Sequence, residues 1–228
     1  AVAKSYYARK IGKRPEEIVV VSVMPCTAKK FEAQRPEMTS SGTCDVDYVL
    51  TTRELARMIK EAGIDFRTLP DEAMDAPLGL SSGAADIFAN TGGVMEAALR
   101  TAFEIVTGRE LPAANLHVAS IAGLEGLKEA ALTIHGAKPE WAFLEGVELK
   151  VAVSHGLGNA RRLLEHISAH GSPYHFVEVM TCPGGCIGGG GQPRFTDDAV
   201  RLKRIAAIYS EDESKRMRKS HENPDIQK

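Results

Sequence analysis

Runs of consecutive apolar residues alternate along this chain with segments whose apolar positions recur every three or four residues. The first run lies within 17–24 and has the core I-V-V-V-S-V. A nearly continuous β-branched run is typical of a strand buried on both faces, as in a parallel sheet. Strands that alternate with helical patterns predict an α/β fold. Further strands are expected at 47–50, 116–121, 147–154 and 175–180.

The helical patterns lie mostly between these runs, at 2–11, 27–35, 51–63, 91–107, 156–170 and 197–218. Thr51 and Glu54 have the spacing of a capping box, in which each side chain binds the other's backbone N–H. Asn90 or Thr91 is expected to cap the next long helix, whose first turn contains two glycines. A glycine-rich helix N-terminus can bind an anion, but this spacing matches neither nucleotide-binding pattern, so nucleotide binding is not favoured.

Composition and charge narrow the class of protein. The chain has 228 residues, of which 43% are hydrophobic and 25% charged, and a formal net charge of −2. These values fit one large domain or two smaller lobes, and they indicate neither a nucleic-acid partner nor a polybasic membrane anchor. No apolar run is long enough to span a bilayer, and the start does not resemble a signal peptide, so a cytoplasmic location is expected.

The chain begins within a helical pattern without a methionine and stops just after an Asn-Pro turn. We therefore expect residues 1–228 to be part of a longer domain, truncated at both ends. The four cysteines are more consistent with metal or redox chemistry than with disulfides, because a chain of this size does not need covalent cross-links to fold.

The most informative segment is 180–193, which reads M-T-C-P-G-G-C-I-G-G-G-G-Q-P. Glycines contribute nothing to an apolar core, so their concentration around Cys182 and Cys186 indicates a backbone that must approach something closely. Thiolates with free backbone N–H groups beside them suit an iron–sulfur or related metal centre. This segment follows the strand expected at 175–180, so both cysteines would lie beyond its carboxyl end.

A third cysteine has a comparable position. Cys26 follows the strand expected at 17–24 directly after Pro25, and ligands in open α/β folds gather at the carboxyl ends of strands. A nearby lysine would stabilise a thiolate or donate to an anionic ligand. The alternative for Cys26 is a small buried apolar residue. Cys44 has no ligand-like neighbours and is expected to have no role in a site, and Phe88 by itself is typical of a core.

Three kinds of cysteine site remain open on the residues alone. Structural zinc usually shows paired C-x-x-C turns with four ligands, whereas three plausible thiols are present here. A thiol-redox pair usually has two residues between its cysteines, and Cys182 and Cys186 have three. An iron–sulfur cubane needs four thiolates, and the fourth could lie upstream of Ala1. The pattern favours the iron–sulfur centre.

These motifs resemble those of the iron-only (FeFe) hydrogenases. Segment 24–32 reads M-P-C-T-A-K-K-F-E and resembles the second signature of that family, M-P-C-x-x-K-x-x-E. Segment 180–193 resembles the third signature. The stretches 47–55, 91–100 and 220–224 are also similar to the family, so the resemblance covers essentially the whole chain.

The resemblance implies an H-cluster, in which a 4Fe-4S cubane is bridged to a di-iron unit bearing CO, cyanide and a dithiolate. Cys26, Cys182 and Cys186 would be cubane ligands, and Cys186 would also bridge to the di-iron unit. Lys29 would donate to a cyanide in a dry pocket. Glu32 would orient Lys29. The pocket would be completed by Met24, Pro25, Phe88, Met180, Gly184 and Gly185, the two glycines letting the backbone approach the di-iron unit.

The resemblance also implies a fold of two lobes, each a mainly parallel sheet flanked by helices, with the cluster in the cleft between them. The parent protein would reduce protons to H₂ reversibly, exchange electrons with ferredoxin or NAD(P)-linked subunits, and need H-cluster maturation proteins. The family's first signature, T-S-C-C-P, is absent, so the isolated fragment is expected to be inactive. The alternative is a non-catalytic iron–sulfur protein of cytosolic iron–sulfur assembly, of the prelamin-recognition-factor-like type.

Overall fold

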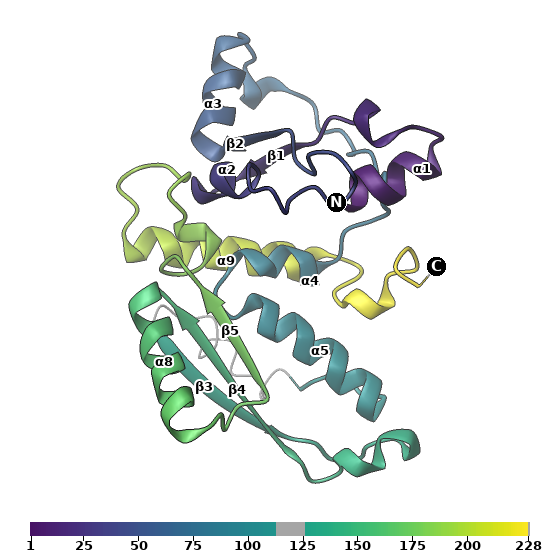
Figure 1. Ribbon diagram of the computed structural model, residues 1–228, viewed down its shortest axis with the longest axis vertical. Coiled ribbons are helices and arrows are strands. Elements are labelled where there is room, and N and C mark those ends of the chain that lie inside the picture. The colour runs from purple at the N-terminus through teal and green to yellow at the C-terminus, as the bar shows by residue number, and fades with distance from the viewer. Residues whose placement is uncertain (113–125, 228) are drawn as a thin grey trace. The chain divides into compact units, whose positions relative to one another are not determined.

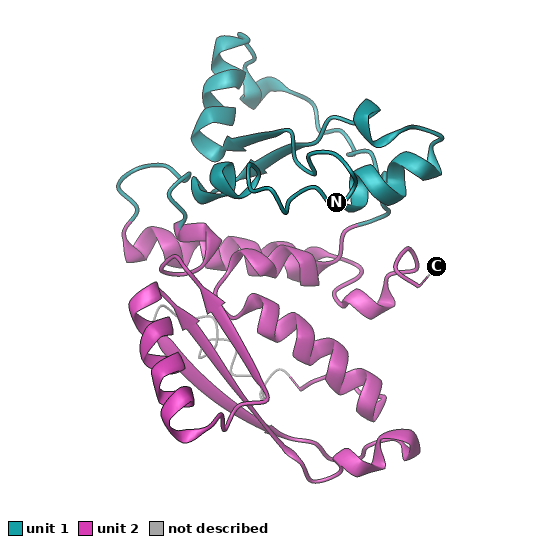
Figure 2. Cartoon of the chain, viewed as in Figure 1, with its two compact units in different colours: residues 1–80, 189–196 teal, residues 81–188, 197–228 magenta. Residues whose placement is uncertain are grey.

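The computed structural model describes residues 1–112 and 126–227, in two compact units (Figure 2). The first unit comprises residues 1–80 and 189–196, and the second comprises residues 81–188 and 197–228. The strand expected at 116–121 lies outside the described residues. Every helix within the described residues falls short of the length and apolarity that a bilayer crossing requires.

The first unit is built on two parallel strands, β1 (Val21–Met24) and β2 (Tyr48–Thr51). Met24 and Thr51 are register partners, so both strands end at the same edge of the sheet. Helix α3 (Thr52–Glu61) begins directly after β2 with the expected capping box, because Thr51 Oγ1 accepts from the Glu54 N–H and the Glu54 carboxylate accepts from the Thr51 N–H at 2.8 Å. The remaining elements are η1 (Ala3–Tyr7), α1 (Ala8–Lys10), η2 (Pro15–Glu17), α2 (Ala28–Glu32) and η3 (Phe66–Thr68).

Strand β1 is shorter and more exposed than the pattern predicts. Only its last four residues are extended in a ladder, and Val21 and Val23 are 50% and 45% exposed. The prediction of a strand buried on both faces is therefore wrong for this unit. The faces of a strand are buried by helices packed on its sheet, and the exposure of Val21 and Val23 shows that the described elements of this unit leave β1 partly uncovered.

An ion pair between a buried lysine and a partly exposed aspartate connects the N-terminal helical segment to this sheet. Lys4 is only 1% exposed, and its ammonium contacts Asp47 Oδ1 at 2.8 Å. The second oxygen of Asp47 accepts the backbone N–H of Val20 at 2.7 Å. One carboxylate thus joins η1 to the start of both strands, and the ammonium with the backbone donor holds the pKa of Asp47 below its usual value.

The second unit contains a three-stranded mixed sheet in the order β3-β4-β5 (Figure 1). Strand β4 (Glu148–His155) pairs parallel with β5 (Phe176–Met180) and antiparallel with β3 (Leu127–Thr133). Strand β3 was not expected, because its sequence L-K-E-A-A-L-T consists mainly of residues that favour helices. Its ladder with β4 overrides that local preference.

Helices cover both faces of this sheet. Met95 and Leu99 of α5 (Gly93–Thr107) pack on Val151 and Val153 of β4, and α8 (Leu157–His170) lies along the other face (Figure 1). Alternation along the strand places His155 on the same face as Val151 and Val153, toward α5. Parallel strands flanked by helices confirm the α/β class. The other elements are α4 (Gly83–Asp86), η4 (Ile87–Ala89), η5 (Pro139–Leu144), η6 (Cys186–Gly188), α9 (Asp198–Ser214) and η7 (Ser220–Glu222).

Candidate metal centre

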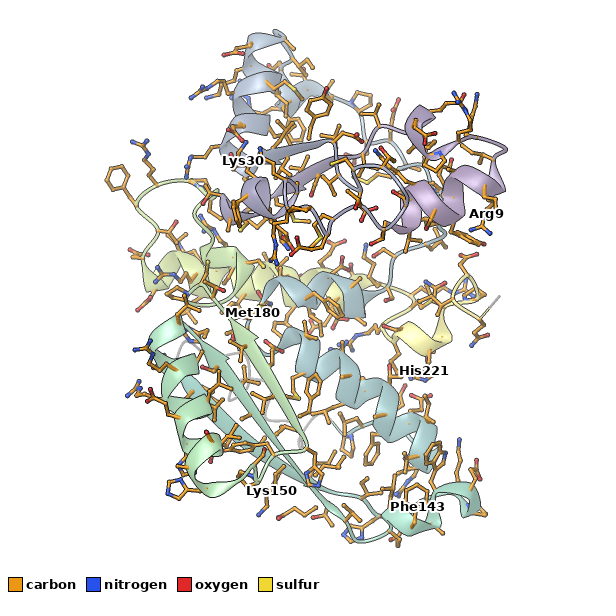
Figure 3. All side chains as sticks on the ribbon, in the orientation of Figure 1. Arg9, Lys30, Phe143, Lys150, Met180 and His221 are labelled. Carbon is orange, nitrogen blue, oxygen red and sulfur yellow. The ribbon has the colours of Figure 1, made fainter. Side chains whose placement is uncertain are left out.

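The turn that carries Cys182 and Cys186 begins at the carboxyl end of β5. That strand ends at Met180 (Figure 3), whose register partner is His155 at the end of β4. Both cysteines are half-buried, and all four cysteines of the chain lack disulfides. The expectation that this motif follows a strand is confirmed. The strand itself is not fully buried as expected, since Glu178 is its one buried residue and Phe176 and Val179 are exposed.

Neighbouring segments hold the turn at its middle residues. The carbonyl oxygen of Gly184 accepts the N–H of Thr91 at 3.1 Å, and the N–H of Gly184 donates to His155 Nδ1 at 3.3 Å. Asn90 and Gly185 form an isolated antiparallel bridge. The backbone between the two cysteines is therefore bound on one side by the segment preceding α5 and on the other by the end of β4.

Gly185 is required by contacts within the chain. Its φ is +87°, and a Cβ at this position would lie 2.6 Å from the backbone nitrogen of Thr91 and 2.9 Å from the carbonyl oxygen of Ala89. No side chain fits there without moving that backbone. The structure thus explains why position 185 must be a glycine, which the sequence alone did not show. The expected approach of Gly184 and Gly185 to a di-iron unit stays a prediction.

Glu178 is a residue of this region that the sequence reasoning missed. Its buried carboxylate accepts the N–H of Gly92 at 2.6 Å and the N–H of Met95 at 2.8 Å, at the N-terminus of α5. The expected cap by Asn90 or Thr91 is wrong: Gly92 occupies the cap position with φ +86°, and no cap residue side chain bonds there. A charged residue within an otherwise apolar strand was the available signal.

The environment of Glu178 has opposing effects on its charge. Burial raises its pKa, whereas the backbone donors at the helix N-terminus favour the carboxylate and act in the other direction. Because this carboxylate already occupies the anion-binding end of α5, the glycines at 92–93 do not form a site for an external phosphate. The expectation against nucleotide binding at this position agrees with that arrangement.

Buried polar atoms without partners gather around the same turn. Asn90 and Thr91 are 0% exposed and His155 is 5% exposed. Among the described residues, neither side-chain amide atom of Asn90 has a hydrogen-bond partner, and the same holds for Thr91 Oγ1 and His155 Nε2. Buried polar groups in folded proteins are nearly always paired, so such a concentration beside a pair of thiols indicates a ligand or ordered water.

In the first unit, the end of the glycine-rich segment packs directly on the other cysteine motif. The N–H of Gly191 donates to the carbonyl oxygen of Pro25 at 3.0 Å. A Cβ on Gly191 would lie 2.8 Å from the backbone nitrogen of Cys26, so this contact requires glycine. Arg53 of α3 fixes the same segment through hydrogen bonds to the carbonyl oxygens of Gly190 and Gln192.

The other expected residues of the first unit lie near Cys26. Lys29 pairs with Glu32 at 2.5 Å in α2, as the sequence suggested, but its side chain is 45% exposed and not in a dry environment within this unit. Met24, the last residue of β1, is partly exposed. Cys44 is exposed, and its thiol donates to the carbonyl oxygen of Val46 at 3.1 Å. Its expected lack of a role in the site stays a prediction.

The expected ligands are divided between the units. Cys26 and Lys29 belong to the first unit, whereas Phe88, Met180 and the Cys182–Cys186 turn belong to the second. Phe88 is 46% exposed, so it is not the core residue that its type alone suggests. Within neither unit do three or more His, Cys, Asp or Glu side chains of the described residues gather as ligands of one metal ion.

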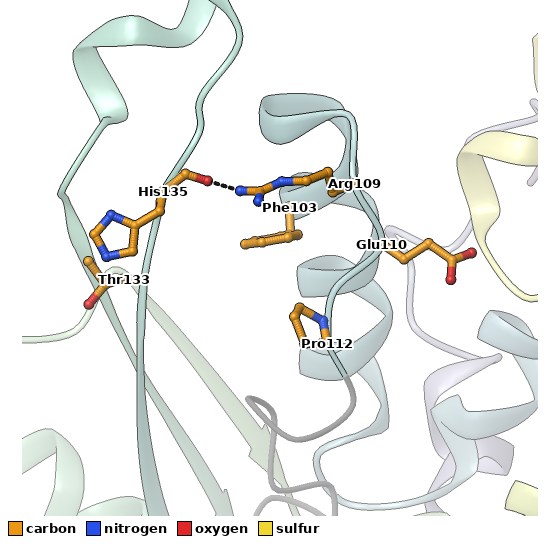
Figure 4. Close-up of a pocket in the computed structure, with 6 residues that line it drawn as sticks. All are labelled: Phe103, Arg109, Glu110, Pro112, Thr133 and His135. Carbon is orange, nitrogen blue, oxygen red and sulfur yellow. Dashed lines mark hydrogen bonds between the residues drawn. The ribbon is translucent and has the colours of Figure 1, made fainter.

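A cavity of about 230 Å³ lies elsewhere in the second unit (Figure 4). Arg109 donates to the carbonyl oxygen of His135 beside the ring of Phe103, while Glu110 points away from both (Figure 4). The cavity is lined by Phe103, Arg109, Glu110, Pro112, Thr133 and His135, none of which is a residue expected in the cysteine site.

Comparison with known proteins gives a consistent result. The family model for the iron-only hydrogenase large subunit, C-terminal domain, matches residues 1–190, and the model for the iron hydrogenase small subunit matches residues 198–228. The NADP-reducing hydrogenase subunit HndD of Solidesulfovibrio fructosivorans is 52% identical over 227 residues, covering 99% of this chain and 37% of that protein. A solved FeFe-hydrogenase from Chlamydomonas reinhardtii has 42% identity and a TM-score of 0.80, covering 99% of this chain and 61% of the solved chain.

The proteins of the alternative class are more distant. Mouse cytosolic iron–sulfur assembly component 3 is 30% identical over 221 residues, covering 92% of this chain and 43% of that protein. The chain spans about two fifths of the length of both curated relatives. From the match over residues 1–190 and the 52% identity to a hydrogenase subunit, the chain belongs to the iron-only hydrogenase family.

Proposed function

We propose that the protein carrying this chain interconverts protons and H₂ at an H-cluster. The observation that supports this most directly is the hydrogen bond from Gly191 to Pro25, with the backbones of Gly191 and Cys26 in close contact. It joins the segment after Cys186 to the segment before Cys26. The segment that follows the second cysteine motif is therefore packed within the first unit against the first motif.

Covalent connectivity adds a limit on the distance between the thiols. Gly191 lies five positions after Cys186, and a fully extended chain of that length spans at most about 18 Å. Since Gly191 contacts Cys26, both thiol sets can serve one inorganic core without breaking the chain.

The residues present fit a sulfur-rich inorganic group. Cys26 and Cys182 each lie two residues beyond a strand end, so the strands fix the start of each motif. Asn90 Nδ2, Thr91 Oγ1 and His155 Nε2 have no partner among the described residues, and each could donate to an acceptor atom such as sulfide.

When bound, a cubane bridged to a di-iron unit would relay electrons and supply the iron site for the reaction. Cys26, Cys182 and Cys186 would hold the cubane. Cys186 would also be shared with the di-iron part of the cluster. Lys29 would donate a charge-assisted hydrogen bond to a cyanide, and Glu32 would hold its ammonium in position. The pocket would be completed by Met24, Pro25, Phe88, Met180, Gly184 and Gly185, which shape it and exclude water.

The proposed substrates are protons and H₂. Electrons would come from ferredoxin or from an NAD(P)-linked subunit, and the name of the relative from Solidesulfovibrio, an NADP-reducing hydrogenase subunit, supports the latter. Insertion of the di-iron unit would need maturation proteins. A cytoplasmic location remains part of this proposal.

Infrared spectroscopy of the full-length protein, co-expressed with maturation proteins, tests the proposal. We expect stretching bands of CO and cyanide together with H₂ evolution from a reduced electron donor. A protein that binds a cubane but shows neither band would instead belong functionally with the iron–sulfur assembly proteins. That result would overturn the hydrogenase proposal, although the family membership would stand.

A further inference from the structure

His155 has two nitrogen atoms in different circumstances. Its Nδ1 accepts the N–H of Gly184 at 3.3 Å, midway between Cys182 and Cys186. Its Nε2 is buried and has no hydrogen-bond partner among the described residues. The residue also lies at the carboxyl end of β4, as the register partner of Met180.

The first of these contacts defines the tautomer of the neutral ring. A nitrogen that accepts an N–H carries a lone pair, so the proton of a neutral imidazole must be on the other nitrogen. Nε2 of His155 is therefore a buried N–H donor, held in place because Gly184 fixes the other side of the ring. A donor of this kind needs an acceptor, and Asn90 and Thr91 add further unpartnered polar atoms at the same turn.

We propose that His155 is a positioning residue of the cluster, which fixes the Cys182–Cys186 turn through Nδ1 and donates through Nε2–H to the sulfur-rich core held there. This inference rests on the proposed function, and it adds a role that the cysteine motifs do not contain. The two roles use different nitrogen atoms of the same ring, so substitutions can separate them.

Donation by Nε2–H has a measurable electrochemical consequence. Hydrogen bonds to the sulfur atoms of a cluster stabilise the reduced form more than the oxidised form, because the reduced form carries more negative charge. Loss of the donor should therefore lower the midpoint potential of the cubane. Loss of the acceptor should instead loosen the turn and reduce the amount of iron retained.

Three substitutions distinguish these effects. In His155→Asn, the side-chain oxygen occupies the position of Nδ1, so the bond from Gly184 is kept and the distal donor is lost. In His155→Gln, the side-chain amide can place a donor near the position of Nε2, and the Gly184 bond is lost. In His155→Phe, a ring of similar size removes both. The matched control is His170→Asn, an exposed histidine at the end of α8.

The experiment uses the full-length protein without its di-iron unit, reconstituted with iron and sulfide and titrated by EPR at a fixed pH. We expect His155→Asn to retain iron and to shift the reduction equilibrium about tenfold toward the oxidised form, which is about 59 mV for one electron. His155→Gln should keep the potential and lose iron faster to a chelator, and His155→Phe should show both changes. His170→Asn should behave as the wild type.

An unchanged potential in His155→Asn and in His155→Phe, in protein that binds a cubane, would overturn the donor role. Unchanged iron retention in His155→Gln and His155→Phe would overturn the positioning role. Failure of the wild type to bind any cubane would be a different result, because it would refute the proposed function itself. Circular dichroism of each variant identifies a substitution that prevents folding, and the two remaining variants then decide the matter.

Discussion

The backbone N–H of Gly191 donates a hydrogen bond of 3.0 Å to the carbonyl oxygen of Pro25, although the two residues are 166 positions apart in the sequence. The bond is possible because Gly191 has no side chain at the point where its backbone meets that of Cys26. It makes the glycine-rich segment a structural partner of the first cysteine motif, in addition to being the continuation of the second.

Substitution Gly191→Ala should therefore impair both stability and cluster binding. The added methyl would lie 2.8 Å from two backbone atoms and 3.0 Å from Thr51 Cβ, and overpacking of this kind costs about 1–3 kcal/mol. Chemical denaturation and iron content of the reconstituted protein measure the two effects. Gly158→Ala, in α8 with open space around it, is the control and should be neutral or slightly stabilising. Equal behaviour of the two variants would contradict the packing argument.

The substitution Asp212→Asn should lower the free energy of unfolding of the second unit. Asp212 is fully buried and accepts from both guanidinium nitrogens of Arg100, each at 2.9 Å, and also from Arg218. Burial opposes its charge, but the bonds from Arg100 and Arg218 hold its pKa below the usual value. Arg100 keeps its ion pair with Glu96 in this variant but loses the anionic acceptor of two further bonds, so we expect a loss of about 1–3 kcal/mol by denaturant titration.

The control for this network is Asp198→Asn. Asp198 pairs with Arg201 on the surface of the same helix and is 73% exposed, so its ion pair contributes well under about 1 kcal/mol. A loss of similar size in both variants would show that the buried network has no special importance.

The capping box of α3 should make the first unit sensitive to acid. Bonds from the Thr51 N–H and then from Lys30 lower the pKa of Glu54 from 4.5 to about 2. A carboxyl whose pKa is lower in the folded state contributes stability that is complete above its unfolded pKa and is lost as the pH falls from 4.5 toward 2. Glu54→Gln preserves a cap but removes the charge, so its stability should depend less on pH over that interval. Parallel curves for wild type and variant would refute the assignment.

Lys29→Ala tests the proposed donor to the di-iron unit. The full-length variant should retain its cubane, because Lys29 is not a ligand, but should lose stable di-iron incorporation or H₂ evolution. Infrared bands and iron content separate these two outcomes. Glu32→Gln should give a milder defect, because the lysine remains but loses the carboxylate that holds it at 2.5 Å. Undiminished H₂ evolution by Lys29→Ala would count against this role.

Cys44→Ser should leave the iron content unaltered. Its thiol donates to the carbonyl oxygen of Val46, and a serine hydroxyl can make the same bond. Cys26→Ser, at a proposed ligand, should lower the iron content in the same assay. Loss of iron from the Cys44 variant would mean that the ligand set has been misassigned.

Local signals in the sequence predicted local structure well. The capping box at Thr51 and Glu54 is present, and α5 ends at Thr107 before Gly108 because that glycine adopts φ +69°. Strand β3 was missed, since a ladder with a neighbouring strand decided its conformation rather than its own residues. Strand β1 was predicted as buried because an apolar run does not reveal whether helices will cover both faces of its sheet.

The site was predictable in its thiols but not in their surroundings. Cys182 and Cys186 are four positions apart and easily recognised, whereas His155 reaches Gly184 from 29 positions away. Asn90 and Thr91 lie still farther along the chain from that turn, and the sequence predicted their side chains as caps of the helix that follows them. Contacts of this kind follow from the packing of α5 against the sheet, which no local pattern encodes.

The carboxylate of Glu178 has a consequence for the alignment of β5. Side chains alternate along a strand, so a slip of one residue would move Glu178 to the opposite face and bring a valine to the amides of Gly92 and Met95. The charge would lose both donors, and Met180 and the cysteines after it would be displaced by one position. The hydrogen bonds between Glu178 and the N-terminus of α5 therefore fix the register of β5. That register determines where the chain leaves the sheet and where the thiols of Cys182 and Cys186 lie.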